Sequence, residues 1–145
     1  SDMSEPPSEK ITPDKALSVD PDTAYFNVTG GKSDHMLVNL GETRLAVKIR
    51  CSNNALYRVS PSSMFIEAGQ CQNLVVVRQA GPARSDKLIL QFLECDKDVE
   101  DCKEFFKQAD KNGAKPETLR ISLKMVGDQG YRVIPSREVT DDAIS

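Results

Sequence analysis

Residues 45–61 read LAVKIRCSNNALYRVSP, and this stretch decides the fold that the sequence predicts. The odd positions from 45 to 51 are apolar, while positions 48, 50 and 52 are polar. Such a period of two is typical of a β-strand with one buried face. Asn53 and Asn54 then predict a turn, because asparagine tolerates a positive φ and hydrogen-bonds its own backbone. A second strand begins at Tyr57 and stops at Pro61, which has no N–H to donate to a sheet.

The same alternation recurs outside this stretch in short runs separated by turn residues. It predicts further strands at 17–20, 23–28, 34–40, 64–66, 72–79, 87–93 and 118–125. Short strands with a turn about every ten residues are typical of an antiparallel β-sandwich. The expected core includes Ile49, Val59, Val76, Leu90 and Ile121.

One helix is expected between the last two strands. Val99, Cys102, Phe106 and Ala109 recur at the spacing of one helical face. Asp96 or Asp98 would cap the start of this helix, and Asn112–Gly113 would end it. We expect the helix to pack over one end of the sandwich, with Phe105 beside its buried face as a candidate partner contact.

Length and composition favour a single domain with polar ends. The 145 residues suffice for one hydrophobic core. Residues 1–16 are rich in proline, serine and charge and predict a disordered N-terminal arm, 17–126 form the domain, and 127–145 form a polar C-terminal tail. The net charge is −4 over residues 1–22, −2 over 127–145 and +3 between them. Such a mildly basic domain favours acidic partners.

Several classes of protein are not expected. Apolar runs such as 74–77 are far shorter than the ~20 residues of a membrane span, and the polar N-terminus shows no secretory signal. The four cysteines form no C-x-x-C pair, so we expect free thiols in the reducing cytoplasm, no metal and no cofactor. No interleaving of aromatic residues with arginine predicts nucleic-acid binding.

No catalytic site is predicted either. His35, the only histidine, has no nucleophile motif near it and is expected to be an exposed structural residue. The acids between 96 and 101 lack the glycine of a calcium loop, and a helix N-terminus explains them better. Because no set of nucleophile, base and oxyanion donors can be assembled, we expect no enzyme.

Two segments carry a resemblance to a known family. VKIRCSNNALYRVSP resembles the signature of the major sperm protein (MSP) domain, K-x-K/R-T/S-S/T followed by Y-x-V-x-P, and SDKLILQF at 85–92 resembles a later strand of that family. The resemblance covers residues 17–126 and is closest to the small, single-domain, sperm-specific members of nematodes. It implies an all-β, immunoglobulin-like, seven-stranded antiparallel sandwich without a catalytic site. It also implies a non-enzymatic interaction module in the cytoplasm, at the sperm cytoskeleton, that binds MSP filaments or itself.

The candidate protein-binding residues are Lys48, Arg50, Ser52, Lys87 and Ile89. Strand alternation places them on the outer side of two strands, and the family arrangement would bring these two strands together. From the pattern alone this surface is a solvated sheet face. In the membrane-tethering relatives of the MSP domain, the VAP proteins, the matching positions bind acidic peptide motifs that contain two aromatic residues.

This sequence keeps only part of that peptide-binding pattern. Arg50 and Lys87 retain the basic character, and Ile89 stands for an apolar methionine. Cys51-Ser52 stands where the relatives have two threonines, Thr118 replaces a lysine, and we expect no transmembrane tail. Binding of acidic linear motifs is therefore the alternative function.

Overall fold

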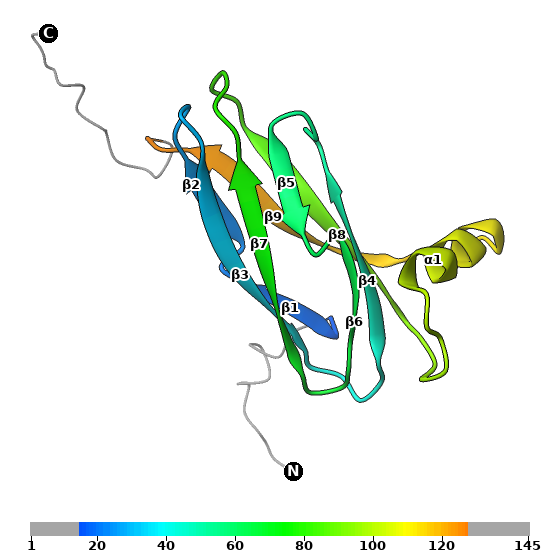
Figure 1. Cartoon of the computed structure of the whole chain (residues 1–145). Coiled ribbons are helices and arrows are strands. Elements are labelled where there is room, and N and C mark those ends of the chain that lie inside the picture. Colours follow the sequence, from blue (N-terminus) through cyan, green and yellow to red (C-terminus); the bar gives the residue numbers. More distant parts are fainter. Residues whose placement is uncertain (1–14, 128–145) are drawn as a thin grey trace, which may run out of the picture.

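The computed structural model describes residues 15–127, which form nine strands and one helix (Figure 1). The four-stranded sheet has the order β1 (Leu17–Asp20), β3 (Gly31–Asn39), β7 (Cys71–Arg78), β5 (Tyr57–Ser60). The five-stranded sheet has the order β2 (Thr23–Phe26), β9 (Glu117–Met125), β8 (Asp86–Glu94), β4 (Leu45–Cys51), β6 (Ser63–Ile66). The expected all-β, immunoglobulin-like sandwich with one short helix is confirmed.

The described residues form nine strands where the family resemblance implied seven, because two segments of the chain each contribute a strand to both sheets. The chain leaves the four-stranded sheet after β1 at Pro21 and after β5 at Pro61, and continues as β2 and β6 in the other sheet. Both prolines follow a cis peptide bond. Proline has no N–H for the ladder, so each pairing ends there. One consequence is that β2 runs parallel to β9, whereas the other strand pairs are antiparallel.

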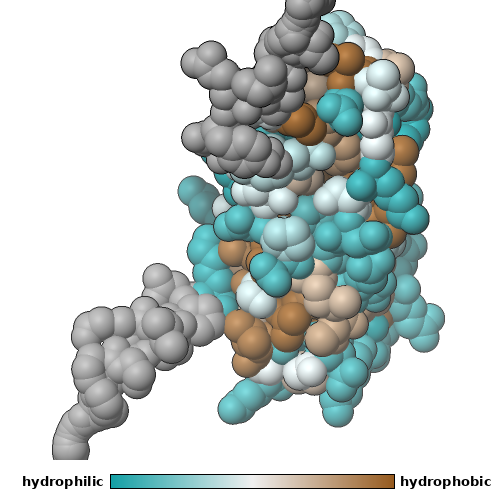
Figure 2. All heavy atoms as spheres, turned by 90° about the vertical axis from the view of Figure 1, so that its left-hand side faces the viewer, coloured by the Kyte–Doolittle hydropathy of each residue, from teal (hydrophilic) through white to brown (hydrophobic). Residues whose placement is uncertain are grey.

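The core lies between the two sheets and follows the predicted alternation. Ile49, Val76, Leu90 and Ile121 are buried as expected, while Val59 on the edge strand β5 is half-buried. Burial of these apolar side chains supplies the main driving force for folding. On the side away from α1 (Cys102–Lys111), apolar residues appear in patches among hydrophilic ones (Figure 2).

His35 is buried, and the expectation of an exposed histidine was wrong. Strand β3 begins at Gly31, earlier than predicted, so position 35 continues the inward series of 37 and 39. The Pro21 carbonyl can only accept, so Nδ1–H of His35 donates to it at 2.6 Å, and Nε2 accepts from the Ser33 hydroxyl at 2.8 Å. These two partners satisfy both ring nitrogens inside the protein.

The helix starts later than the sequence predicted. Its N-cap is Asp101, whose carboxylate accepts from the Glu104 N–H at 3.0 Å, so Asp96 and Asp98 were the wrong caps. Arg44 donates to the carbonyl oxygens of Asp96 and Val99, at 2.7 and 2.9 Å, which holds this segment outside the helix. The last helical residue is Lys111, Asn112 caps the C-terminus as predicted, and Gly113 follows with a φ of +76°.

The helix packs on the outer surface of the five-stranded sheet rather than over an end of the sandwich (Figure 1). It contributes Cys102 and Phe106 to a second buried cluster with Ala46 and Cys95, and Phe105 packs half-buried against this cluster. Ala46 is a small side chain that points outward from β4, so the helix can lie close to the sheet there. The helix therefore covers one part of the outer surface and leaves the rest open.

Candidate protein-interaction face

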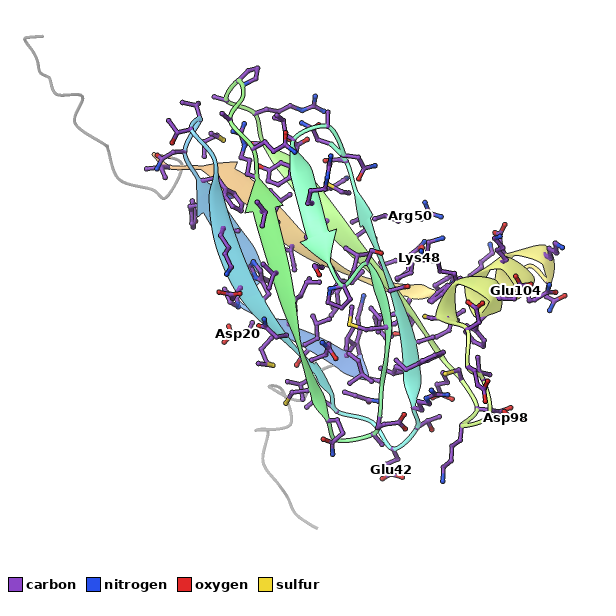
Figure 3. The ribbon with its side chains drawn as sticks, in the orientation of Figure 1. Asp20, Glu42, Lys48, Arg50, Asp98 and Glu104 are labelled. Carbon is purple, nitrogen blue, oxygen red and sulfur yellow. The ribbon has the colours of Figure 1, made fainter. Side chains whose placement is uncertain are left out.

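The register of the five-stranded sheet places the candidate residues side by side. Arg50 of β4 lies opposite Ile89 of β8, and Ile89 lies opposite Arg120 of β9. One row further along, Lys48 lies opposite Gln91. Lys48 and Arg50 project from β4 on the side where α1 lies (Figure 3). The strand pairing that we expected from the family resemblance is therefore present.

Ser52 and Lys87 join this surface at the far end of β4. The Ser52 N–H donates to the Lys87 carbonyl, and the Lys87 N–H donates to the Ser52 hydroxyl oxygen, both at 3.0 Å. The Ser52 hydroxyl itself donates to the Asp86 carboxylate at 2.9 Å. All five candidate residues thus lie on one face, but the Ser52 hydroxyl is occupied in holding β4 and β8 together.

The buried carboxylate of Asp86 anchors this end of the face. Besides Ser52, it accepts from the Asn53 amide at 3.2 Å and pairs with the Arg84 Nε at 3.0 Å. Hydrogen bonds to an ionised acceptor are stronger than those between neutral groups. Asp86 therefore fixes the backbone from which Lys87 projects.

Sequence reasoning left two cations out of the candidate site. Arg120 and Lys124 of β9 point to the same side, because Leu119, Ile121 and Leu123 point inward. The alternation at 118–125 already placed Arg120 and Lys124 on the outer side of their strand. It did not predict that this strand pairs with β8, next to the candidate residues. We define the basic face by five residues, which are Lys48, Arg50, Lys87, Arg120 and Lys124.

The outward positions of β4, β8 and β9 carry these five cations and no acid. No carboxylate within residues 15–127 lies close enough to form an ion pair with any of them. Arg50, Lys87 and Arg120 are exposed, and Ile89 between the two arginines is half-buried. Unneutralised charges of one sign create a local potential that attracts the opposite charge.

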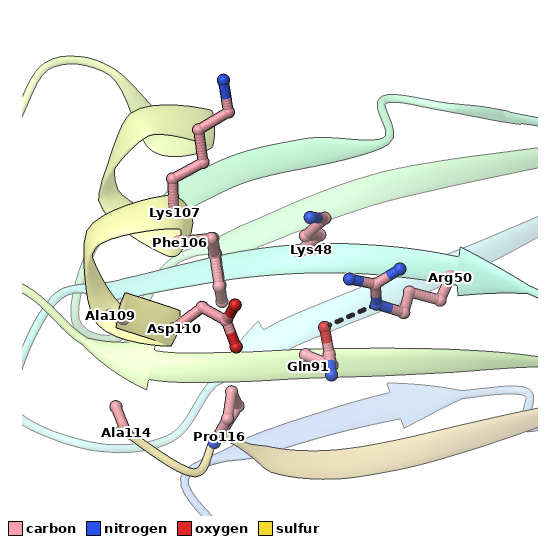
Figure 4. A pocket seen from close by; sticks show the side chains of 9 residues that line it. All are labelled: Lys48, Arg50, Gln91, Phe106, Lys107, Ala109, Asp110, Ala114 and Pro116. Atoms are coloured by element: carbon pink, nitrogen blue, oxygen red, sulfur yellow. Dashed lines mark hydrogen bonds between the residues drawn. The ribbon is translucent and has the colours of Figure 1, made fainter. Parts of the chain in front are cut away.

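A hollow of about 180 Å³ lies where the basic face meets α1 (Figure 4). Phe106, Ala109 and Pro116 supply its apolar lining. Its other lining residues are Lys48, Arg50, Gln91, Lys107, Asp110 and Ala114. The Arg50 Nε donates to the Gln91 side-chain oxygen at 3.1 Å, which orients the guanidinium (Figure 4).

The described residues show no assembled reactive centre. Burial raises the pKa of the Cys102, Cys95 and Cys51 thiols, so these groups stay protonated at neutral pH and are poor nucleophiles. Cys71 is exposed, and all four cysteines are free thiols. Between residues 15 and 127, no three His, Cys, Asp or Glu side chains are arranged to hold a metal ion. No helix in that range is long and apolar enough to span a membrane.

Solved structures share this architecture. SSP-19, an MSP-domain protein of Caenorhabditis elegans, matches with a TM-score of 0.66 at 30% identity, over 74% of this chain and 97% of that one. WR4, a C. elegans MSP family member, matches with a TM-score of 0.65 at 33% identity, over 76% of this chain and 95% of that one. A PapD-like domain of human CEP192, at 14% identity and a TM-score of 0.54, shares the fold alone.

Sequence comparison gives the same result. Sperm-specific class P protein 31 of C. elegans is 39% identical over 110 residues, which are 76% of this chain and 97% of that protein. Sperm-specific class P protein 32 of the same organism is 36% identical over 108 residues, again covering 97% of the relative. The family profile of the MSP (Major sperm protein) domain matches residues 16–115. This chain therefore belongs to the MSP domain family, together with sperm-specific proteins of nematodes.

Proposed function

We propose that this chain is a non-enzymatic protein-interaction module of the sperm cytoskeleton, and that the basic face is its contact surface. One observation carries the proposal: five cations without a single acid occupy the outward positions of β4, β8 and β9. Charges of both signs, mixed on one surface, are sufficient to keep a sheet face soluble. Unbalanced charge beside a half-buried Ile89 suits a protein partner.

The chemistry of this face favours an acidic segment with an apolar anchor. Arg50 and Arg120 flank Ile89 across three neighbouring strands, so an extended chain can place carboxylates on the arginines and an apolar side chain between them. Each exposed ion pair contributes less than ~1 kcal/mol, so the affinity is modest and falls with salt.

The rest of the described chain supports a role without catalysis. His35 is buried with both ring nitrogens bonded, and three of the four thiols have raised pKa values.

The relatives favour two sources of the acidic segment. They are named for sperm-specific expression, so an MSP-family filament or a second copy of this chain is the first source, and any other acidic peptide of the sperm cytoplasm is the second. Sedimentation across a concentration series separates self-association from binding to another protein.

The test is a double charge reversal on the basic face. Arg50→Glu combined with Lys87→Glu removes two of the five cations and adds two acids without touching the core. Titration calorimetry with a polyglutamate peptide, and a pull-down from nematode sperm extract, should both show weakened binding, while the thermal melt stays cooperative.

The matched control lies on the other sheet. Lys32 and Arg58 are exposed on the outer side of β3 and β5, so Lys32→Glu with Arg58→Glu makes the same change in net charge. If this control weakens binding as much as the first pair does, net charge rather than the basic face is responsible, and the proposal fails.

A further inference from the structure

Strand β2, at one border of the five-stranded sheet, has backbone groups without a partner. Among the described strands it pairs only with β9 (Figure 1). The Val126 N–H donates to the Phe26 carbonyl at 2.9 Å, so the even positions of β2 direct their backbone groups toward β9. Because this direction alternates along a strand, the N–H and C=O groups of Thr23 and Tyr25 point to the free edge. No residue between 15 and 127 forms a hydrogen bond with them.

Exposed apolar side chains gather where β2 ends. Tyr25, Val28 and Val126 are 38%, 49% and 40% exposed, and they are three of the six large apolar side chains that are exposed within residues 15–127. Tyr25 lies on the outer side of the sheet, opposite Lys124 of β9. An additional strand beside β2 would cover part of this apolar surface and pair the free backbone groups.

The chain leaves the described part of the fold beside this edge. Strand β9 ends at Met125, and Gly127 follows with a φ of +108°, a conformation that favours glycine. Residues 127–130 read Gly-Asp-Gln-Gly, which is rich in turn residues, and residues 128–145 lie outside the described range. A strand beyond β2 would lie two strand spacings from β9, roughly 10 Å, and four residues can span that distance.

The sequence after this turn repeats that of a border strand of this protein. Residues 131–135 read YRVIP, and residues 57–61 read YRVSP. The earlier copy forms β5, a four-residue strand at the border of the other sheet, and its proline ends the pairing. In β5 the tyrosine is buried and the arginine is exposed. The later copy therefore has the pattern of a border strand with the same length and the same inward and outward sides.

We propose that residues 131–134 dock on the free edge of β2 as an additional, antiparallel strand of the five-stranded sheet. This inference goes beyond the proposed function, because it concerns the border of the sheet and not the basic face. Arg132 then lies opposite Tyr25, and the two residues exchange their backbone hydrogen bonds. On the outer side, the Arg132 guanidinium covers the exposed Tyr25 ring, whose π-face attracts a cation.

The tether decides in favour of this segment over a free partner. Only residues 127–130 separate it from Val126, whose backbone is bonded to β2. A segment on so short a linker reaches a neighbouring site at an effective concentration in the millimolar range. The docked segment closes the border at which another chain could pair with β2.

The experiment is amide hydrogen exchange of the whole chain, followed by NMR. Docking protects the Tyr25 N–H, so Arg132→Pro, which removes a donor and disturbs the added strand, should speed its exchange at least about fivefold. The Ala24 N–H faces β9 and should exchange equally in both proteins, which shows that the sheet is intact. Arg137→Pro is the matched control, because it makes the same substitution beyond the segment, and it should leave Tyr25 protected.

A second measurement determines the register. In an antiparallel ladder, the residue pairs without mutual hydrogen bonds have the closest Cα atoms. With Arg132 opposite Tyr25, the adjacent pair is Ala24 and Val133. A nuclear Overhauser contact between their α protons is expected in the parent and in Arg137→Pro, and it should be absent in Arg132→Pro.

The possible occupants of the edge give different results. Equal exchange of the Tyr25 N–H in the parent and in Arg132→Pro, without the contact between Ala24 and Val133, would overturn the proposal. Protection of Tyr25 that decreases on dilution would show that the segment docks on a second copy, and the assignment within one chain would fail. Protection that is independent of concentration and accompanied by the contact supports docking within the chain.

Discussion

The two outer faces of the sandwich follow the same alternating pattern but carry different charges. On the four-stranded sheet, the outward charged residues Asp20, Asp34, Lys32 and Arg58 cancel one another, and the exposed Met36 and Val77 lie among them. On the five-stranded sheet, the outward charges of β4, β8 and β9 are all positive. The helix covers part of this second face only.

This difference in charge is the property on which the proposed contact surface rests. Alternation of apolar and polar residues only separates inside from outside, and both faces satisfy it. Segregation of charge sign is an additional property that folding does not require, since mutual repulsion of the cations opposes it. Substitutions on one face at a time, with a matched substitution elsewhere, test this difference.

The largest effect is expected from neighbouring residues on opposite sides of β9. Ile121→Ala removes a fully buried side chain and should lower the free energy of unfolding by ~2–5 kcal/mol. Ser122→Ala, one residue on and facing outward, should change it by less than ~0.5 kcal/mol. Equilibrium denaturation measures both, and equal stability of Ile121→Ala and the parent would contradict the strand register.

The next effect concerns the carboxylate that anchors the basic face. Asp86→Ala should cost ~1–3 kcal/mol, because it leaves the Ser52, Asn53 and Arg84 donors without their acceptor. Asp34 is exposed on the outer side of β3, and Asp34→Ala removes the same charge from the other face at a cost below ~0.5 kcal/mol. A similar loss in both variants, measured by urea unfolding, would show that Asp86 is no anchor.

A pH effect is expected from the thiol beneath the helix. Burial holds the pKa of Cys102 above that of an unfolded thiol, so the unfolded chain releases this proton first as the pH rises. Stability should therefore be full below the ordinary thiol pKa and decline above it. Thermal melts from neutral to alkaline pH should show a smaller decline in Cys102→Ala. The exposed Cys71→Ala is the control, and an equal flattening there would refute the explanation.

The smallest effect is a gain of affinity. Thr118 is exposed, and its place on β9 is directly opposite Gln91 of β8. Thr118→Lys would add a sixth cation to the basic face and should tighten binding of a polyglutamate peptide by less than ~1 kcal/mol. Asn73→Lys on the other face should add nothing. The gain should vanish at high salt, and a gain that persists there would exclude an electrostatic origin.

Local sequence predicted the strands well, because each strand buries one side. The segments 17–20 and 57–60 were found as predicted, since a proline ends each of them. The switch of the chain to the other sheet after each proline depends on contacts far along the sequence, so the alternating pattern did not predict it.

The errors occurred where polar groups find partners inside the fold. The alternation of β3 turns His35 inward, and the Pro21 carbonyl and the Ser33 hydroxyl satisfy its ring there. The helix begins after Asp101 because Arg44 holds the segment before it in a turn. In both cases the deciding partner is a hydrogen-bonding group that a hydrophobic pattern does not detect.

The candidate site was predicted only in part, because alternation and the family resemblance do not give the order of the strands. Alternation and the family resemblance together placed Arg50, Lys87 and Ile89 on one side, and their strands are neighbours. Arg120 was missed because the local alternating pattern does not predict that β9 lies next to β8 in the sheet. The hollow was missed because it depends on the position of α1 over the sheet.

The two prolines also limit how copies of this domain can join. Each outermost strand, β1, β5, β2 or β6, has only four residues, because the chain crosses to the other sheet at Pro21 and Pro61. Such short borders give a neighbouring molecule little backbone to pair with, and natural proteins use them to avoid runaway fibre growth. Contacts between copies of this domain therefore depend on side chains rather than on pairing of exposed main chain.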